Sequence, residues 1–495
     1  MVPNILLITA DQWRADCLSI LGHPSVRTPN LDRLARQGVL FANHWSQATP
    51  CGPARASLLT GTYAFNHRSI TNGTPLDARH RTIAEILARA GYACRLFGYT
   101  DTSVDPRTVP PGDPRLFTYE GVAAGFCPEL LLLEDLEPWL AHLAERGYGR
   151  HTLADLHDRP VERPAPWRAE DSETAFLTDA FLAWLDRRPA EPWFVHLSWI
   201  KPHPPWLAAQ PWHGLVDRAR VPAAVACSGP DHPWLIAHRA IGYEGWVGRH
   251  VGQPGRIAPD RLVEARAVYY GLVSEVDFHL GRILEALARR ELLDRTLLVV
   301  TSDHGEMLGD HGLFGKSGFF PQAFRVPLVI RDPRPGAARG LVVRDFTEHV
   351  DLFPTLCEAA GTRVPLQCDG LSLSRHLTGE RPVIWRQAAV CEHHFADPAS
   401  RTYEQRLGLS EDACGLILRV DRRSLYVHFF GLPPLLFDLA SDPDCCRDLA
   451  AQPARLSDRL ACAEALLAFR MCMGERRLSR VRLTPSGPVG RFDPD

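Results

Sequence analysis

The chain has 495 residues, of which 23% are charged, and its formal net charge is −3. This length predicts a large core and two domains, and the balanced charge gives no reason to expect nucleic acid or an anionic membrane as a partner. No apolar run reaches the length of a membrane-spanning helix, and the N-terminus lacks a signal-peptide pattern. The 13 cysteines lack paired C-x-x-C spacing, which indicates reduced thiols rather than a disulfide framework, so we expect a cytoplasmic protein.

Strands and helices alternate along the first part of the chain. Apolar runs typical of buried strands occupy residues 4–10, 39–43, 92–99, 193–200 and 296–302. Runs typical of helices, several ending at a glycine, occupy residues 28–38, 51–61, 82–91, 173–187 and 262–287. This alternation predicts an α/β fold with a large doubly wound sheet flanked by helices.

The composition changes near residue 370. We place a large α/β domain at residues 1–370, with a loop-rich insertion at about 206–259, where proline, tryptophan and histidine are frequent and periodicity is absent. A smaller α+β domain is expected at 371–474. Its expected elements are strands at 416–420 and 425–430 and a helix at 453–473. The tail, 475–495, shows no helix or strand pattern.

The stretch from Thr49 to Gly61 places a cysteine at the start of a short helix. Pro53 suits the first helical turn and Gly61 suits a left-handed helix end. Cys51 therefore lies where free N–H groups favour an anion, and Arg55 lies one turn further on the same face. A buried structural cysteine is the alternative, and the C-x-P-x-R pattern does not exclude it. Tyrosine phosphatases place more residues between their cysteine and arginine than this chain does.

Four polar clusters follow apolar runs. They are Asp11-Gln12, Cys51 to Arg55, Lys201-x-His203 and Asp303-His304. Each cluster alone has a structural explanation, such as a helix cap or a loop charge. Because the carboxyl ends of parallel strands meet at one edge of a sheet, we expect the clusters to form one pocket.

Part of this pocket has the composition of a metal site. Asp11, Gln12, Asp303 and His304 offer carboxylate, amide and imidazole ligands, which suit a divalent ion. The imidazole favours manganese, zinc or iron over calcium. Lys316 lies a short way downstream and would reach the same pocket as a cation.

These motifs resemble the sulfatase branch of the alkaline phosphatase superfamily, in the family's order and over nearly the whole chain. The residues that carry the likeness are Asp11, the Cys51 helix, Lys201-x-His203, Ser302 to Glu306, Gly309 to Gly312, Lys316, Leu436 to Leu439 and Asp442-Pro443.

Four segments look most like the bacterial phosphonate monoester hydrolases, which also cleave phosphodiesters. They are Asp11 to Asp16, Cys51 to Arg55, Asp105 to Arg107 and Pro202 to Pro205. Typical arylsulfatases have a second Asp where this chain has Gln12, often Asn in place of His304, and usually Ser in place of Ala54.

The resemblance implies that a formylglycine-generating enzyme oxidises Cys51 to formylglycine, whose hydrated aldehyde attacks a small anionic ester. It implies one divalent metal, with Mn²⁺ favoured and Zn²⁺, Fe²⁺ or Ca²⁺ as alternatives. The implied ligands are Asp11, Gln12, Asp303, His304 and the modified Cys51. Arg55, Lys316 and His203 would stabilise the transferred group, and His203 or Lys316 would protonate the leaving oxygen. Asn72 and Tyr99 would contact the substrate.

Two other functions remain open. One is an arylsulfatase, since sulfate monoesters, phosphonate monoesters and phosphodiesters are all monoanions. The other is a non-catalytic metal-binding relative, if Cys51 is never modified. The tail resembles those of phosphonate hydrolases, whose subunits associate, so we expect a homo-oligomer with the tail across a subunit boundary; a frayed terminus is the alternative.

Asp101 departs from the resemblance, because it stands where phosphonate hydrolases have a small hydroxyl residue. It follows a strand end, which places it on the rim of the pocket. Asp101 either turns away to pair with a loop arginine or cap a turn, or faces the leaving-group end and favours positively charged leaving groups.

Overall fold

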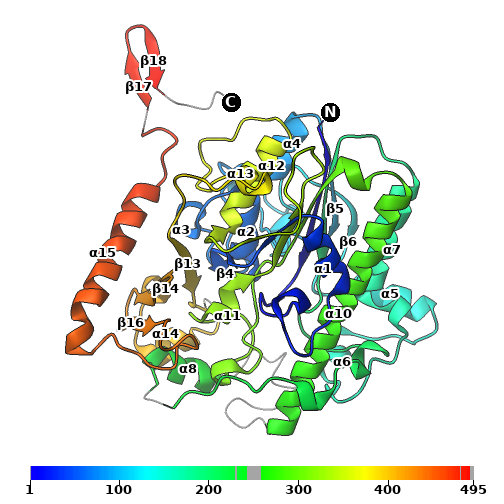
Figure 1. The fold of residues 1–495 in the computed structure, drawn as a ribbon, viewed down its shortest axis with the longest axis horizontal. Coiled ribbons are helices and arrows are strands. Elements are labelled where there is room, and N and C mark those ends of the chain that lie inside the picture. Colours follow the sequence, from blue (N-terminus) through cyan, green and yellow to red (C-terminus); the bar gives the residue numbers. More distant parts are fainter. Residues whose placement is uncertain (1, 229–230, 242–257, 398, 480, 491–495) are drawn as a thin grey trace.

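The computed structural model describes residues 2–228, 231–241, 258–397, 399–479 and 481–490 (Figure 1). Among these residues, eight strands form the large sheet. In spatial order they are β11 (Leu341–Val343), β2 (Val39–Phe41), β10 (Leu328–Arg331), β8 (Thr296–Thr301), β1 (Asn4–Ala10), β7 (Trp193–Trp199), β5 (Ala93–Gly98) and β6 (Cys127–Leu131). β10 is antiparallel to both neighbours and the other pairs are parallel.

The sheet is covered on both faces, which confirms the expected doubly wound α/β fold. Leu6 and Ile8 of β1 pack in one core and Ile5 and Leu7 in the other, because successive strand residues point to opposite faces. Helices of the first core are α1 (Pro29–Arg36), α7 (Glu173–Asp186) and α10 (Pro259–Arg289) (Figure 1). Helices of the second are α2 (Cys51–Thr60), α4 (Ile83–Arg89) and α12 (Leu352–Ala359).

The central strands end level with one another. In the parallel register, Ala10 at the end of β1 pairs with Trp199 at the end of β7, and Thr9 pairs with Thr301 at the end of β8. The residues that follow these strands therefore emerge at one edge of the sheet, as the sequence predicts.

A smaller sheet borrows a strand from the N-terminal part of the chain. Its order is β16 (Leu435–Asp438), β15 (Ser424–Phe429), β14 (Gly415–Asp421), β13 (Ala388–His394) and β4 (Ala48–Thr49). Helix α15 (Leu456–Met473) packs on it through Cys462 and Leu466. The domain limits near residues 370 and 474 stay a prediction, but β4 shows that both parts of the chain build this sheet.

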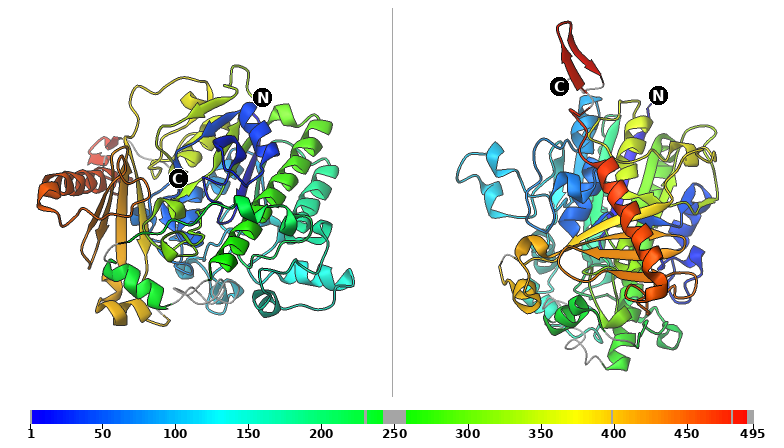
Figure 2. Two further views of the ribbon diagram at one scale, coloured as in Figure 1. Left: turned by 60° about the horizontal axis from the view of Figure 1, so that its bottom comes forward. Right: turned by 90° about the vertical axis from the view of Figure 1, so that its left-hand side faces the viewer.

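Two segments contain elements that the sequence pattern does not predict. The insertion contains helix α8 (Pro233–Ile241), whose Trp234 stacks on Tyr403 of α14 (Thr402–Leu407); residues 229–230 and 242–257 of the insertion lie outside the described residues. The tail forms a hairpin of β17 (Val481–Thr484) and β18 (Gly487–Gly490), with Pro485 and Ser486 at the turn and Gly487, which has a φ of 108°, directly after it. The hairpin depends on the residues of its turn, and α8 depends on packing against a distant segment of the chain. Neither element therefore leaves a periodic apolar pattern in the sequence. The hairpin projects from the body of the protein (Figures 1 and 2).

The expectation of wholly reduced cysteines is wrong. Cys227 in the insertion and Cys446 near the C-terminal sheet form a disulfide across a sequence separation of 219 residues. Such a distant pair leaves no spacing signal in the sequence. The other 11 cysteines are free thiols. Within the part of the chain that the structure describes, no helix combines the length and apolar character needed to cross a bilayer.

Candidate active site

Cys51 is the first residue of helix α2, and Pro50 alone separates it from strand β4 of the smaller sheet. The helix ends as predicted at Gly61, which has a φ of 67° and whose N–H donates to the carbonyl of Ser57. Every residue of α2 is buried, so the helix is fixed on all sides. At its start, the N–H of Gly52 donates to Oδ1 of Asn72 at 2.9 Å, which places the predicted substrate residue Asn72 beside Cys51.

The sulfur of Cys51 lies between an imidazole and an ammonium group. It is 3.2 Å from Nε2 of His304 and 2.9 Å from Nζ of Lys316. Burial raises the pKa of the Cys51 thiol, Asp11 adds to the rise, and Lys316 partly offsets it. An unmodified Cys51 is therefore a poor thiolate nucleophile at neutral pH, unlike the activated cysteine of a thiol enzyme.

Four of the five predicted metal ligands converge around this sulfur. Ligand atoms of Asp11, Cys51, Asp303 and His304 lie within 4.8 Å of one another, and all four residues are buried. Oδ1 of Asp11 has no hydrogen-bond partner. Burial alone would raise the pKa of Asp11, but the side chains around it, which are His203, His304, Lys316 and Arg55, hold the pKa well below its ordinary value. Asp11 is therefore a buried anion with one oxygen still unsatisfied.

His304 presents a lone pair to the same point. Its Nδ1 lies 2.9 Å from the carbonyl oxygen of Gly305, and because a carbonyl only accepts, Nδ1 carries the hydrogen. Nε2 is then unprotonated, and it lies 3.5 Å from the unsatisfied Oδ1 of Asp11. A lone pair and a carboxylate that face each other in a buried site require a cation between them. The donor set therefore fits a divalent metal ion.

Gln12, the fifth predicted ligand, is held by Glu306, which belongs to the Ser302–Glu306 motif but has no role predicted from the sequence. Its φ of 69° is left-handed, and its backbone N–H donates to Oδ1 of Asp303. The amide Nε2 donates to Glu306, so Oε1 faces the pocket, 3.4 Å from Nζ of Lys316. Glu306 is fully buried and also accepts from the N–H groups of Leu308 and Gly315. The sequence signal for Glu306 was its position three residues after Asp303.

Arg55 is completely buried and its donors are committed to protein acceptors. Its guanidinium donates to Asp303 at 2.9 Å and to Asp11 at 3.2 Å. It also donates to Ser198 at 2.7 Å and lies 4.0 Å above the ring of Tyr99. Arg55 thus holds the two carboxylates in place. Ser198, at the end of β7, was not singled out in the sequence, where a strand serine carries no signal.

Tyr99 and Asp101 both lie at the site but differ in their contacts. The Tyr99 hydroxyl donates to Oδ2 of Asp11, so Tyr99 supports the proposed metal ligand. Asp101 is 3% exposed, has a left-handed φ of 48°, and neither of its carboxylate oxygens has a hydrogen-bond partner. Asp101 therefore does not pair with a loop arginine or cap a turn.

His203 and Lys316 form a pair beside Cys51. Nζ of Lys316 lies 3.3 Å from Nε2 of His203, and Nδ1 of His203 lies 2.7 Å from the carbonyl oxygen of Pro204. The carbonyl again fixes the hydrogen on Nδ1, so Nε2 accepts from the ammonium. Burial and the nearby Lys316 lower the pKa of His203 to about 3, which makes it neutral at pH 7.

Lys201 does not reach the pocket. Its ammonium pairs with Glu173 at 3.1 Å and donates to the carbonyl oxygens of His203 and Pro205. It therefore positions the loop that carries His203. An acid missed in the sequence, Glu134, lies close instead: a carboxylate oxygen of Glu134, a ring nitrogen of His203 and the Cys51 sulfur lie within 4.8 Å of one another.

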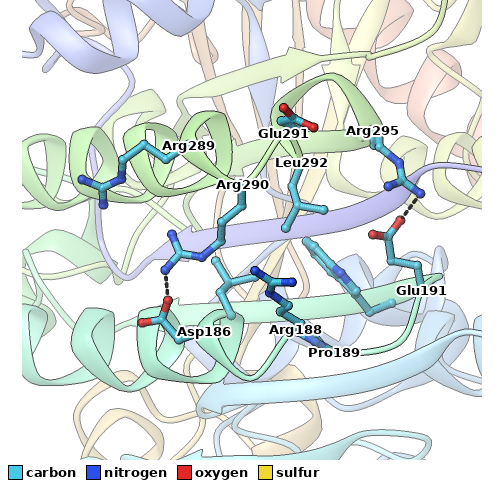
Figure 3. A pocket seen from close by; sticks show the side chains of 11 residues that line it. Asp186, Arg188, Pro189, Glu191, Arg289, Arg290, Glu291, Leu292 and Arg295 are labelled. Atoms are coloured by element: carbon cyan, nitrogen blue, oxygen red, sulfur yellow. Dashed lines mark hydrogen bonds and ion pairs between the residues drawn. The ribbon is translucent and has the colours of Figure 1, made fainter.

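A separate surface pocket lies at the opposite edge of the sheet, at the amino ends of β7 and β8 (Figure 3). Two of its arginines are paired, Arg290 with Asp186 and Arg295 with Glu191 at 2.8 Å. Because the convergent polar groups lie at the carboxyl ends of the strands, this pocket is not part of the candidate active site.

Comparison with known families finds two matches. The family described as Sulfatase matches residues 3–362, and the family described as N-sulphoglucosamine sulphohydrolase, C-terminal, matches residues 309–464. The first covers every predicted site residue. The overlap between the matches includes Lys316.

Similar proteins cover the chain from end to end. The multifunctional alkaline phosphatase superfamily protein PehA of Trinickia caryophylli is 36% identical over 514 aligned residues, covering 99% of each chain. The phosphonate monoester hydrolase of Agrobacterium radiobacter has a TM-score of 0.92 and 42% identity, covering 99% of this chain and 100% of that one. The phosphonate monoester hydrolase SpPMH from Silicibacter pomeroyi has a TM-score of 0.93 and 39% identity, covering 100% of both.

Proposed function

The chain belongs to the sulfatase family of the alkaline phosphatase superfamily, and we propose that it hydrolyses phosphonate monoesters and phosphodiesters through a formylglycine made from Cys51. The observation that carries the proposal is the position of Cys51, buried at the start of α2 between the Asp11–His304 cluster and the ammonium of Lys316. The two similar structures named phosphonate monoester hydrolases favour this ester class.

Family membership implies a divalent metal, and we assign it to Asp11, Gln12, Asp303, His304 and the modified residue 51. Manganese is our first choice of ion because imidazole and carboxylate ligands occur together. The ion, when bound, would supply Lewis acidity to the group being transferred. Arg55 keeps Asp11 and Asp303 oriented, and Glu306 fixes the amide of Gln12 so that its oxygen faces the pocket.

The nucleophile would be a hydroxyl of hydrated formylglycine at position 51, where the Cys51 sulfur now stands. One hydroxyl oxygen forms a bond to phosphorus while the ester oxygen–phosphorus bond breaks. The second hydroxyl then loses its proton, and the carbon–oxygen bond to the phosphorylated oxygen breaks to restore the aldehyde. The buried position keeps bulk water away from this carbon.

Lys316 and His203 would supply the proton for the departing oxygen. Lys316 carries the proton, and neutral His203 accepts a hydrogen bond from it through Nε2. His203 therefore orients or relays the Lys316 proton, because its own Nε2 carries no proton to donate at neutral pH.

Mass spectrometry of the Cys51 peptide, with parallel assays on a phosphonate monoester, a phosphodiester and an aryl sulfate, tests the proposal. We expect formylglycine at position 51 and turnover that Cys51→Ala abolishes without loss of fold, whereas Cys472→Ala, at an exposed cysteine, has no effect. Turnover by Cys51→Ala with metal present would overturn the mechanism. Preference for the aryl sulfate would make the chain an arylsulfatase, and an unmodified, inactive Cys51 would make it a non-catalytic relative.

The expected partners and location stay proposals. Modification of Cys51 requires a formylglycine-generating enzyme. The exposed apolar side chains of the tail hairpin, with Leu483 85% exposed, support its packing across a subunit boundary in a homo-oligomer. The free cysteines support a cytoplasmic location, and the Cys227–Cys446 disulfide argues against it.

A further inference from the structure

The pocket holds more carboxylates than a metal ion and an anionic ester require. The two negative charges of Asp11 and Asp303 balance the charge of a divalent ion. The two positive charges of Arg55 and Lys316 exceed the single negative charge of a monoanionic ester by one. Asp101 and Glu134 then add two negative charges close to Cys51. With both acids ionised, the loaded site has one excess negative charge, which would repel an ester whose other parts are neutral.

Asp101 lies against the start of the Cys51 helix. A Cβ atom added at Gly52 would stand 3.5 Å from Oδ2 of Asp101, so the carboxylate borders the residue next to Cys51. Its oxygens are unsatisfied although the side chain is 97% buried, and a buried carboxylate without a donor is unfavourable. Burial and the acid Glu134 raise the pKa of Asp101 well above its ordinary value, and Arg55 and Lys316 offset only part of this rise. A cation bound beside the carboxyl would favour its ionised form.

Glu134 extends this acidic side of the pocket toward solvent. One of its oxygens lies within 4.8 Å of the Cys51 sulfur and of a ring nitrogen of His203, which belongs to the proposed leaving-group side. Its Oε2 accepts from the hydroxyl of Tyr119 at 2.6 Å, and its N–H donates to Glu120. The half-buried Glu134 thus has a fixed position, with an aromatic ring beside it.

We propose that Asp101 and Glu134 form an ammonium subsite that selects esters with a positively charged leaving group, such as esters of amino alcohols. This inference rests on the proposed function and specifies its substrate class. An ammonium group there supplies the donors that Asp101 lacks and removes the excess negative charge. A second metal ion would need Cys51 and His203 as ligands besides Glu134. It is a poorer occupant, because the ammonium of Lys316 already contacts the Cys51 sulfur at 2.9 Å and Nε2 of His203 at 3.3 Å.

The test compares two methylphosphonate aryl esters of matched leaving-group pKa, one with an aminomethyl group, which is protonated at neutral pH, and one with an ethyl group of the same size. We expect wild type to favour the cationic ester in kcat/KM by about tenfold to a hundredfold, the range of a charged hydrogen-bonded contact. Asp101→Asn and Glu134→Gln, which keep the shapes of the side chains, should each reduce this ratio by about tenfold. An unchanged ratio in both variants overturns the subsite.

Binding provides a readout that does not depend on turnover. Ethanolamine, protonated at neutral pH, should inhibit wild type competitively and more strongly than its neutral analogue propan-1-ol, and Asp101→Asn should remove the difference. Asp135→Asn, at an exposed acid next to Glu134, is the matched control and should keep the wild-type ratio. Equal inhibition by the two alcohols in wild type contradicts the proposal.

The outcomes separate this inference from the proposed function. If wild type hydrolyses the neutral ester and shows no preference for the cationic ester, only the subsite fails. If neither ester is hydrolysed above the Cys51→Ala background, the proposed function fails. Two metal ions per chain in wild type and one in Asp101→Asn would show that the carboxylates hold a second ion, which overturns the ammonium subsite.

Discussion

Thr49 pairs in parallel register with His393, and its hydroxyl lies 3.1 Å from Nδ1 of that histidine, although 344 residues separate the two. Thr49 precedes Cys51 by two positions, so the smaller sheet fixes the start of the helix that carries the nucleophile. The protein shortened to residues 1–370 contains every proposed catalytic and metal-binding residue but lacks β13.

We therefore expect residues 1–370 alone to be inactive. Without β13 the strand β4 loses its pairing partner, and the start of α2 loses its orientation. Circular dichroism and the phosphonate assay on the shortened chain check this. Activity close to that of the full chain would show that the smaller sheet does not position Cys51.

The metal assignment predicts linked losses of metal and activity. Asp303→Ala removes a buried charged ligand and leaves Arg55 without one partner, so both should fall sharply. Glu306→Gln leaves the ligands in place but disturbs Gln12, and we expect an affinity loss of about 10- to 100-fold, as for other residues that orient ligands. Elemental analysis and metal titration measure both. A full metal complement in Asp303→Ala would exclude Asp303 as a ligand.

The proton pathway predicts sensitivity to the leaving group. His203→Ala and Lys316→Met should lower kcat/KM for alkoxide leaving groups more than for activated phenolates, by about 10²-fold or more. The decrease of kcat/KM with rising leaving-group pKa should be steeper for Lys316→Met than for His203→Ala, because Lys316 carries the proton and His203 only accepts a hydrogen bond from it. A series of esters with graded leaving-group pKa measures these slopes. Equal losses across the series would remove both residues from proton donation.

Buried histidines should make stability depend on pH. Burial and the nearby Arg282 lower the pKa of His279 from 6.5 to about 3, and Arg282 donates to its Nδ1. Between these values the unfolded chain binds a proton that the folded chain does not, so stability falls as pH drops below 6.5. The loss at pH 5 is about 2 kcal/mol for this histidine.

Urea unfolding of wild type and His279→Gln at pH 7.5, 6 and 5 measures this effect. The difference in unfolding free energy between the two proteins should shift by about 2 kcal/mol in favour of the variant as pH falls from 7.5 to 5. His279 lies on α10, away from the metal-ligand cluster, so the comparison does not depend on metal binding. A pH-independent difference would contradict the assignment.

The tail predicts an oligomer that depends on it. Deleting residues 475–495 removes the hairpin and its exposed Leu483 and Val489, and we expect a smaller particle by light scattering. Leu483→Ser, which keeps the hairpin, should weaken association less than the deletion. The same particle size for the full and shortened chains would mean that the hairpin is not an interface.

Much of the architecture was predictable because local patterns are strong where a segment is buried on both faces. Strand β1 is a continuous apolar run that ends in Asp11, and α2 carries both its start and stop signals. By contrast, α8 and the tail hairpin are not predicted, since Trp234 is stabilised by Tyr403 from a distant segment and the hairpin leaves apolar side chains exposed.

The sequence by itself determined the chemistry of the site: residue types at strand ends and at a helix start specify metal ligands, a nucleophile precursor and cations without any coordinates. Only the tertiary structure decided how these groups are used. It commits Arg55 to Asp11 and Asp303, turns Lys201 away toward Glu173, and brings the unpredicted Glu134 beside Cys51. The physical reason is that hydrogen bonds and charge balance in a buried site depend on which neighbours the fold supplies, and those neighbours lie far apart in the chain.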